Sequence, residues 1–239
     1  MTRPVLVLAL VALALPVTGC RSNEERSAEL EHKALAAGHG NSSNEGVSIK
    51  VPSRFVHVVA TAALTGKEAD AVAITLRNEG PKALAGMPIE FAVLGAGGKQ
   101  LYTNAAGGLA PSLERVPTIP AHGELTWVDD QVTLTSRIAR VTARVGEGRP
   151  SSAPPIAVSG VHTVTEAGAE ALEASITSPG PATYSELVVY ASARRGGRVV
   201  AAGRAIVSSV PPHNAVAVPQ IFLAGSAKGA TLQVTAPVP

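Results

Sequence analysis

The sequence has few of the residues that usually cross-link a small protein or carry its chemistry. Its 239 residues include one cysteine, so it can form neither an internal disulfide nor a thiolate metal cluster. Aromatic residues make up only 3% of the chain, so a hydrophobic core must come mainly from Val, Ile, Leu and Ala. The formal net charge of +2 is too small for the strong field expected of a nucleic-acid-binding protein.

The chain does contain many turn-forming residues, and they recur in order. The 23 Gly and 18 Pro disfavour long helices and favour short strands joined by turns. A turn, a strand, a Gly-Gly hairpin and a Pro-His corner occur twice, at 78–81 and 178–181, 88–93 and 187–192, 97–99 and 196–198, and 119–122 and 210–213. We therefore predict two copies of one β-domain, each long enough to bury its own core and fold alone.

The predicted domains span residues 47–146 and 155–239, with a linker at 147–154 that is rich in Ser, Pro and Gly. Within them, apolar side chains alternate with small or polar ones, the period of a strand with one buried face. The strands are expected at 49–60, 71–77, 88–94, 100–104, 124–132, 138–145, 156–164, 171–177, 187–193, 199–207, 216–223 and 231–235. This spacing predicts an all-β fold of two tandem immunoglobulin-like sandwiches.

The hairpin region resembles a bacterial domain type. An aromatic-aliphatic strand at 88–94 precedes a Gly-rich turn, as in FxLYD β-sandwich domains. Gly95 stands where that family usually has an acidic residue, and Ala191-Ser192 follow the Tyr of the second copy. The resemblance implies a fold and no activity.

The first 19 residues have the pattern of a targeting segment. Arg3 precedes an apolar run from Val5 to Leu15, shorter than the ~20 residues that a membrane-spanning helix needs. The run ends in Val17-Thr18-Gly19-Cys20, which resembles the lipobox of bacterial lipoproteins. That family implies a diacylglyceryl thioether on Cys20, cleavage before it, and retention on the outer face of the cell membrane or outer membrane. The alternative is an ordinary secretory signal followed by a chance cysteine.

Residues 20–46 are polar and rich in Ser, Asn, Glu and Gly, which is typical of a tether. Ser22 to Glu25 fit a capping box, so we expect a short helix over about 23–37 and flexible chain after it.

Four histidines occupy repeated positions and are the candidate metal ligands. His57 parallels His162 near the start of each domain, and His122 parallels His213 at the Pro corner. Imidazole is a common ligand for metals, but no Met, Cys or carboxylate recurs beside these histidines. We predict that they are structural and that the protein has no cofactor, with a metal or small-ligand site as the alternative.

The sequence has no pattern typical of catalysis. Asp129 and Asp130 are adjacent on a predicted strand, so they point to opposite faces and do not form an acid/base pair by default. We interpret them as a solvated strand end, with a calcium ligand as the alternative. Gly95 to Gly98 are a hairpin turn, and neither GxSxG nor SxxK spacing occurs. We predict that the protein is not an enzyme; a hydrolase is the most distant alternative.

An arginine cluster distinguishes the second copy. Arg194, Arg195, Arg198 and Arg204 lie on and beside its hairpin, where the first copy has only Lys99. They form either a solvated turn or a contact with anionic lipid headgroups or cell-wall polymer.

These features together predict a surface lipoprotein that acts as a non-enzymatic interaction or structural module of the cell envelope. The alternative is a small-ligand or metal-binding lipoprotein that uses the histidines. The expected partners are the membrane, through the lipid on Cys20, and an envelope protein or anionic polymer, but no nucleic acid.

Overall fold

The computed structural model describes residues 46–67, 69–134, 137–166 and 168–239. The predicted signal peptide at 1–19, Cys20, the helix at 23–37 and the rest of the tether up to residue 45 lie outside the described residues. Among the described residues, no helix combines the length and the apolar character needed to cross a bilayer. The described chain is almost entirely antiparallel β-structure, so the all-β prediction is confirmed.

The first half of the chain forms two main sheets. Its elements are β1 (Val56–Thr65), β2 (Asp70–Asn78), β3 (Leu84–Ala85), β4 (Met87–Gly95), η1 (Ala96–Gly98), β5 (Gln100–Thr103), α2 (Pro111–Glu114), β6 (Arg115–Val116), β7 (Glu124–Asp129), β8 (Ile138–Val145) and β9 (Arg149–Pro150). One sheet has the order β1-β2-β7, and in the other β4 pairs with β5, β6 and β8. Phe91 on β4 packs edge-on against Trp127 on β7, with ring centroids 5.8 Å apart, so the two sheets share a core.

The second half forms two more main sheets. Its elements are β10 (Ala157–Glu166), β11 (Ala169–Thr177), β12 (Tyr184–Arg195), β13 (Arg198–Val210), β14 (Ala215–Ala217), β15 (Ile221–Phe222), β16 (Ala224–Gly225) and β17 (Thr231–Thr235). One sheet has the order β16-β13-β12-β17, and in the other β11 pairs with β10, β14 and β15. Leu172 and Ile176 of one sheet pack in a common core with Val189 and Val207 of the other.

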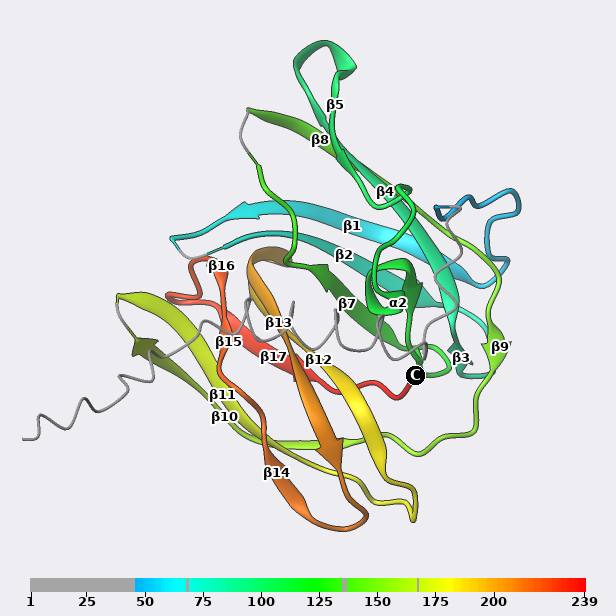
Figure 1. Ribbon diagram of the computed structural model, residues 1–239, viewed down its shortest axis with the longest axis vertical. Coiled ribbons are helices and arrows are strands. Elements are labelled where there is room, and N and C mark those ends of the chain that lie inside the picture. The colour runs from blue at the N-terminus through cyan, green and yellow to red at the C-terminus, as the bar shows by residue number, and fades with distance from the viewer. Residues whose placement is uncertain (1–45, 68, 135–136, 167) are drawn as a thin grey trace, which may run out of the picture.

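The two halves pack against each other through the β1-β2-β7 sheet and the β12-β13 pair. Figure 1 shows β12 and β13 running across the direction of β1 and β2. Tyr190, Ala202 and Ala224 belong to the same buried cluster as Trp127 and Phe91. The core of the first half therefore continues into the second half, a contact that was not predicted from the sequence. The predicted division into two domains stays a prediction.

The first strand begins later than predicted. Residues 49–55 were expected to continue into β1, but Pro52 forms an isolated bridge with Gly146, and the Ser53 amide donates to the Val145 carbonyl at 2.8 Å. This stretch therefore lies beside the β8 sheet, and the chain crosses to β2 only at Val56. The Ser53 hydroxyl accepts the amides of Phe55 and Val56 and stabilises the crossing.

The strand expected at 216–223 is divided in two. β14 and β15 both pair with β11, at 175–177 and 171–172 respectively. Pro219 lies between them and cannot donate a backbone hydrogen bond, which interrupts the ladder. The neighbouring backbone of β15 passes so close to β13 that a Cβ on Gly203 would lie 2.0 Å from the Phe222 carbonyl oxygen, so only glycine fits there.

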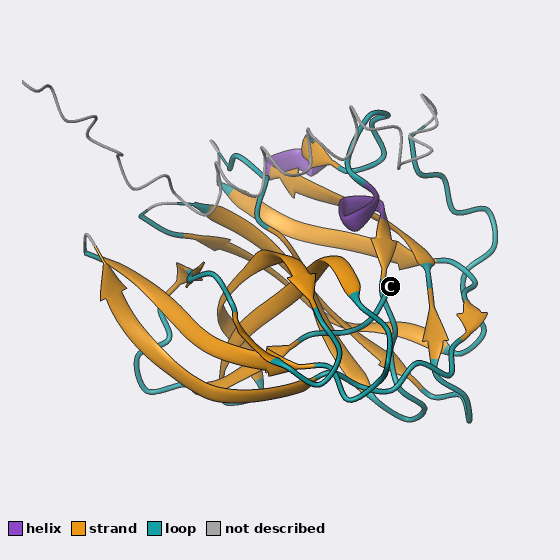
Figure 2. Cartoon of the chain, turned by 60° about the horizontal axis from the view of Figure 1, so that its bottom comes forward, coloured by secondary structure: helices purple, strands orange, loops and turns teal. Residues whose placement is uncertain are grey.

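The repeated Gly-Gly turns occupy equivalent places. Gly97 and Gly98 lie between β4 and β5, and Gly196 and Gly197 lie between β12 and β13; all four have positive φ. The two turns are therefore hairpin turns, as predicted, and glycine is favoured because it enters this region without steric cost. Figure 2 shows the long strands and how little helix the chain contains.

Candidate functional site: a polar interface between the two halves

The acidic pair of the first half meets the arginine cluster of the second. Asp130 follows β7, and its Oδ1 lies 2.7 Å from Nε of Arg204 on β13. The Arg204 guanidinium also donates from Nη1 to the hydroxyl of Ser112 on α2, at 3.2 Å. Arg204 is 1% exposed, so this ion pair lies inside the protein and joins the two halves.

Asp129 is buried beside this ion pair, on the face of β7 that Trp127 also occupies. Its Oδ2 accepts the hydroxyl of Tyr102 at 3.2 Å, and its Oδ1 accepts the Gln131 amide at 2.9 Å. Burial raises the pKa of Asp129 to about 6, and the nearby Arg204 charge and the Gln131 amide oppose that rise. Burial, and then the Asp129 charge, raise the pKa of Tyr102 far above its usual range, so the phenol remains a donor.

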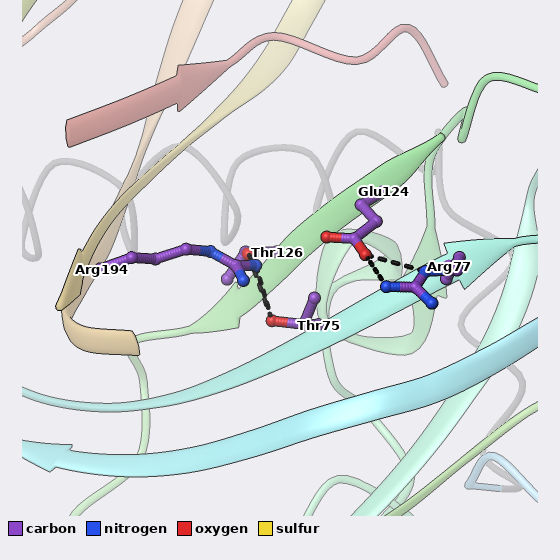
Figure 3. Close-up of polar contacts among 5 residues, drawn as sticks. All are labelled: Thr75, Arg77, Glu124, Thr126 and Arg194. Atoms are coloured by element: carbon purple, nitrogen blue, oxygen red, sulfur yellow. Dashed lines mark hydrogen bonds and ion pairs between the residues drawn. The ribbon is translucent and has the colours of Figure 1, made fainter. Parts of the chain in front are cut away.

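A second arginine crosses the interface where it is less buried (Figure 3). Nη2 of Arg194 donates to the hydroxyls of Thr75 on β2 and Thr126 on β7, at 3.1 and 2.9 Å. Farther along the same two strands, the Arg77 guanidinium donates to Oε1 of Glu124, at 2.9 Å from Nε and 2.6 Å from Nη2. That pair, within the first half, is 50% exposed at Arg77 and 37% exposed at Glu124.

Between these polar groups the interface is apolar. Ala73 and Val128 of the first half and Tyr190 and Ala202 of the second are buried in one cluster. The arrangement is that of a packed protein interface, with an apolar centre, a buried ion pair at one end and hydrogen bonds at the other. The polar side chains of the interface form an ion pair and hydrogen bonds with one another. These contacts join the β1-β2-β7 sheet to the sheet that contains β12 and β13.

This arrangement corrects two predictions. Asp129 and Asp130 are not a solvated strand end, because Asp129 is buried and Asp130 pairs with Arg204. Arg204 is unavailable to an anionic surface, and Arg194 is engaged by the two threonines. The other two members of the cluster, Arg195 and Arg198, are exposed, and Arg195 donates to the Lys228 carbonyl.

The sequence did contain a signal for this interface. The acidic pair occurs only in the first copy and the arginine cluster only in the second, so each copy departs from the repeat with an opposite charge. Departures of opposite sign in two otherwise similar halves favour a complementary contact between them.

Two of the four repeated histidines have a backbone role. His122 and His213 are exposed and have φ values of 53° and 58°, in the left-handed region where histidine is enriched. The His122 amide donates to the Gly80 carbonyl and the His213 amide to the Ser178 carbonyl, so each ties its corner to the turn that follows the neighbouring strand. These contacts explain the repetition without a ligand.

The other two histidines are exposed, His57 near the start of β1 and His162 in the middle of β10. Nε2 of His57 lies 3.7 Å from Glu79, and Nε2 of His162 lies 3.3 Å from Glu173, whose other oxygen accepts from Gln220. Within the described ranges, no three His, Cys, Asp or Glu side chains gather as a metal site would require. The absence of a metal and of a cofactor stays a prediction.

The chain has little similarity to known proteins. No protein-family model matches the chain, and no curated protein sequence matches it. Among solved structures it is similar to the crystal structure of red sea bream transglutaminase, at 15% identity and a TM-score of 0.20. The match covers 94% of this chain and 30% of that chain, so this chain spans less than a third of the transglutaminase. A similarity at this score carries no argument about fold or function.

Proposed function

We propose that the protein is a lipoprotein held on the outer face of a bacterial membrane by acyl chains on Cys20, where it acts as a non-enzymatic interaction or structural module. The observation that carries the anchor is Val17-Thr18-Gly19-Cys20 directly after a short apolar run. Two acyl chains, at about 0.8 kcal/mol per buried CH₂, anchor a protein durably, whereas one chain binds only marginally.

The geometry of the interface supports the second part of the proposal. Its ionisable side chains Asp129, Asp130 and Arg204, of which Asp130 is partly exposed, are bonded to one another or to neighbouring groups across packed sheets. They make a stable body whose outer surfaces are available to partners. We propose that this body consists of two immunoglobulin-like sandwiches that act as one unit.

The anchor is tested by changing Cys20→Ser in the full chain and fractionating the cells that express it. We expect the wild type in the membrane fraction and the variant without acyl chains, released into the soluble exported fraction. Thr18→Ala is the matched control, because it keeps the lipobox pattern and should leave acylation and retention intact. Equal membrane retention of the Cys20→Ser chain would refute the anchor.

A further inference from the structure

The described residues expose their large apolar side chains in one short stretch. Val51, Phe55 and Val59 are 67%, 38% and 43% exposed. All three precede or begin β1, within residues 51–59. Exposed apolar side chains are common one at a time, but three of them within nine residues, beside basic side chains, point to this stretch as a site of contact.

Basic side chains lie within this stretch. Lys50 and Arg54 are exposed and flank Val51 and Phe55 in the sequence, and the Arg54 guanidinium carbon lies 6.0 Å from the centre of the Phe55 ring. The acidic neighbours are Glu147 and Glu90, which accept the amides of Arg54 at 2.9 Å and of Ile49 at 3.2 Å, and Glu79, which lies beside His57.

The backbone of the stretch is held firmly. The Pro52 bridge to Gly146 and the Ser53 hydrogen bonds fix it at the point where the chain crosses between sheets. The Phe55 side chain packs against the Gly80 turn, where a Cβ on the glycine would meet its ring at 2.9 Å. Val51 and the basic side chains are therefore presented from a fixed loop.

The stretch also lies where the described chain begins. Residues 21–46 lie between it and the cysteine of the lipobox, and 26 residues of coil have an end-to-end distance of about 30 Å. Among the exposed loops of the described chain, this loop lies nearest in sequence to the proposed anchor at Cys20. The hairpin with Arg195 and Arg198 is basic too, but no large apolar side chain is exposed there.

We propose that residues 50–55, together with Val59, dock on the anionic bilayer that holds the lipid anchor, with Val51 and Phe55 in the headgroup region and Lys50 and Arg54 against lipid phosphates. Apolar and basic side chains side by side are the pattern of interfacial binding, because burial and charge attraction act together. The inference depends on the proposed anchor, which makes docking an intramolecular step.

The test uses the acylated full chain in vesicles of equal parts phosphatidylglycerol and phosphatidylcholine. Cys20 is the sole cysteine and is blocked as a thioether, so Val51→Cys gives one site for an environment-sensitive dye. We expect the dye emission to shift to the blue in these vesicles, and the shift to fall in raised salt or in phosphatidylcholine alone. The dye on Ala215→Cys, an exposed position of β14 far from the loop in Figure 1, should stay in water.

Charge variants identify the docking surface. Lys50→Gln and Arg54→Gln should each lower the ratio of docked to undocked protein about fivefold, the factor that corresponds to ~1 kcal/mol per basic residue near an anionic surface. Arg195→Gln and Arg198→Gln are the matched controls, and they should leave the ratio unchanged.

The outcomes separate the two proposals. A wild-type chain that is not acylated and does not enter vesicles overturns the anchor. An anchored chain whose dye at position 51 reports water, as at position 215, overturns the docking surface alone. If Arg195→Gln and Arg198→Gln abolish docking and Lys50→Gln and Arg54→Gln do not, the membrane contact belongs to the hairpin. That result would also overturn the proposed docking surface.

Discussion

Arg204 is a charged side chain buried in a protein interface. Its bonding partners explain how the cost of burying the charge is offset. Removing a guanidinium and a carboxylate from water costs several kcal/mol each, and their attraction offsets this only when the geometry is good and the remaining donors find partners. Arg204 meets that condition through Asp130 at 2.7 Å and Ser112 at 3.2 Å. We expect such a pair to fix how β13 lies on β7 more than it adds to stability.

The first prediction concerns a single residue and replaces Arg204. Arg204→Met should cost about 3–5 kcal/mol of unfolding free energy, because Asp130 is left without its cation beside Asp129. Adding Asp130→Asn should recover much of that loss, whereas the control Arg198→Met, on an exposed side chain, should change stability by less than about 0.5 kcal/mol. Denaturant unfolding measures all of these. A loss no larger for Arg204→Met than for Arg198→Met would refute a buried ion pair.

Asp129 gives a prediction with a definite pH range. Its pKa rises from 3.8 to about 6 in the folded protein, so between these values the folded state binds more protons than the unfolded state. Stability therefore falls as pH rises from about 4 to above 6, by about 3 kcal/mol at 1.36 kcal/mol per pKa unit.

Asp129→Asn keeps an oxygen for the Gln131 amide and removes the buried charge. We expect the variant to melt at a higher temperature than the wild type at pH 7 and to lose most of the pH dependence between 4 and 6. Melting curves over this range check both expectations, with Glu124→Gln as a control on an exposed carboxylate of the same strand. A variant that is less stable than the wild type at pH 7 would show that the charge is favourable where it lies.

At the scale of the strand, β2 shows what an alternating pattern can and cannot predict. Val72, Ile74 and Leu76 face the core of the first half, as their period-two spacing predicts. The intervening side chains are small, and they too are buried, because the second half covers them. Alternation defines two faces, but it does not say whether the smaller side chains meet water or another sheet.

Strand ends that depend on nearby residues could be predicted from the sequence, and strand ends that depend on distant contacts could not. The bounds of β8 and β17 agree with the predicted 138–145 and 231–235, since alternation and flanking turns define them locally. The start of β1 at Val56 could not be predicted, because it depends on a bridge between Pro52 and Gly146, far apart in the chain. The polar interface was missed for the same reason, although its two charged groups were each noticed as exceptions to the repeat.

At the scale of the whole molecule, the four main sheets lie one behind another. The sheet containing β4 and β8 packs on β1-β2-β7, which packs on the β12-β13 sheet, and that sheet packs on β10-β11. Both faces are therefore buried in β2, in β7 and in the central parts of β12 and β13. Stability should then depend on both halves being present, which replaces the expectation that each half folds alone.

Fragments test this dependence. The separate fragments 47–146 and 155–239 each expose a face that is buried in the full chain, including Val128 and Tyr190. We expect the full chain to melt in one cooperative transition, and each fragment to melt at a much lower temperature or to remain unfolded by circular dichroism. Burial of apolar area contributes about 25 cal/mol per Å², so loss of this face alone removes a large part of a stability that is typically 5–15 kcal/mol.

A full chain that is cleaved after folding is the control for the separately made fragments. A protease site inserted after the exposed Ser152 divides the chain beyond the β3–β9 pair, so cleavage breaks the linker without removing any strand. The two pieces should remain together on gel filtration and still melt as one unit, because the interface and not the linker holds them. Arg204→Met should weaken that association and allow the cut pieces to separate at lower protein concentration. If the pieces separate freely, and each melts at the temperature of the intact chain, the halves are independent domains and the shared core contributes no stability.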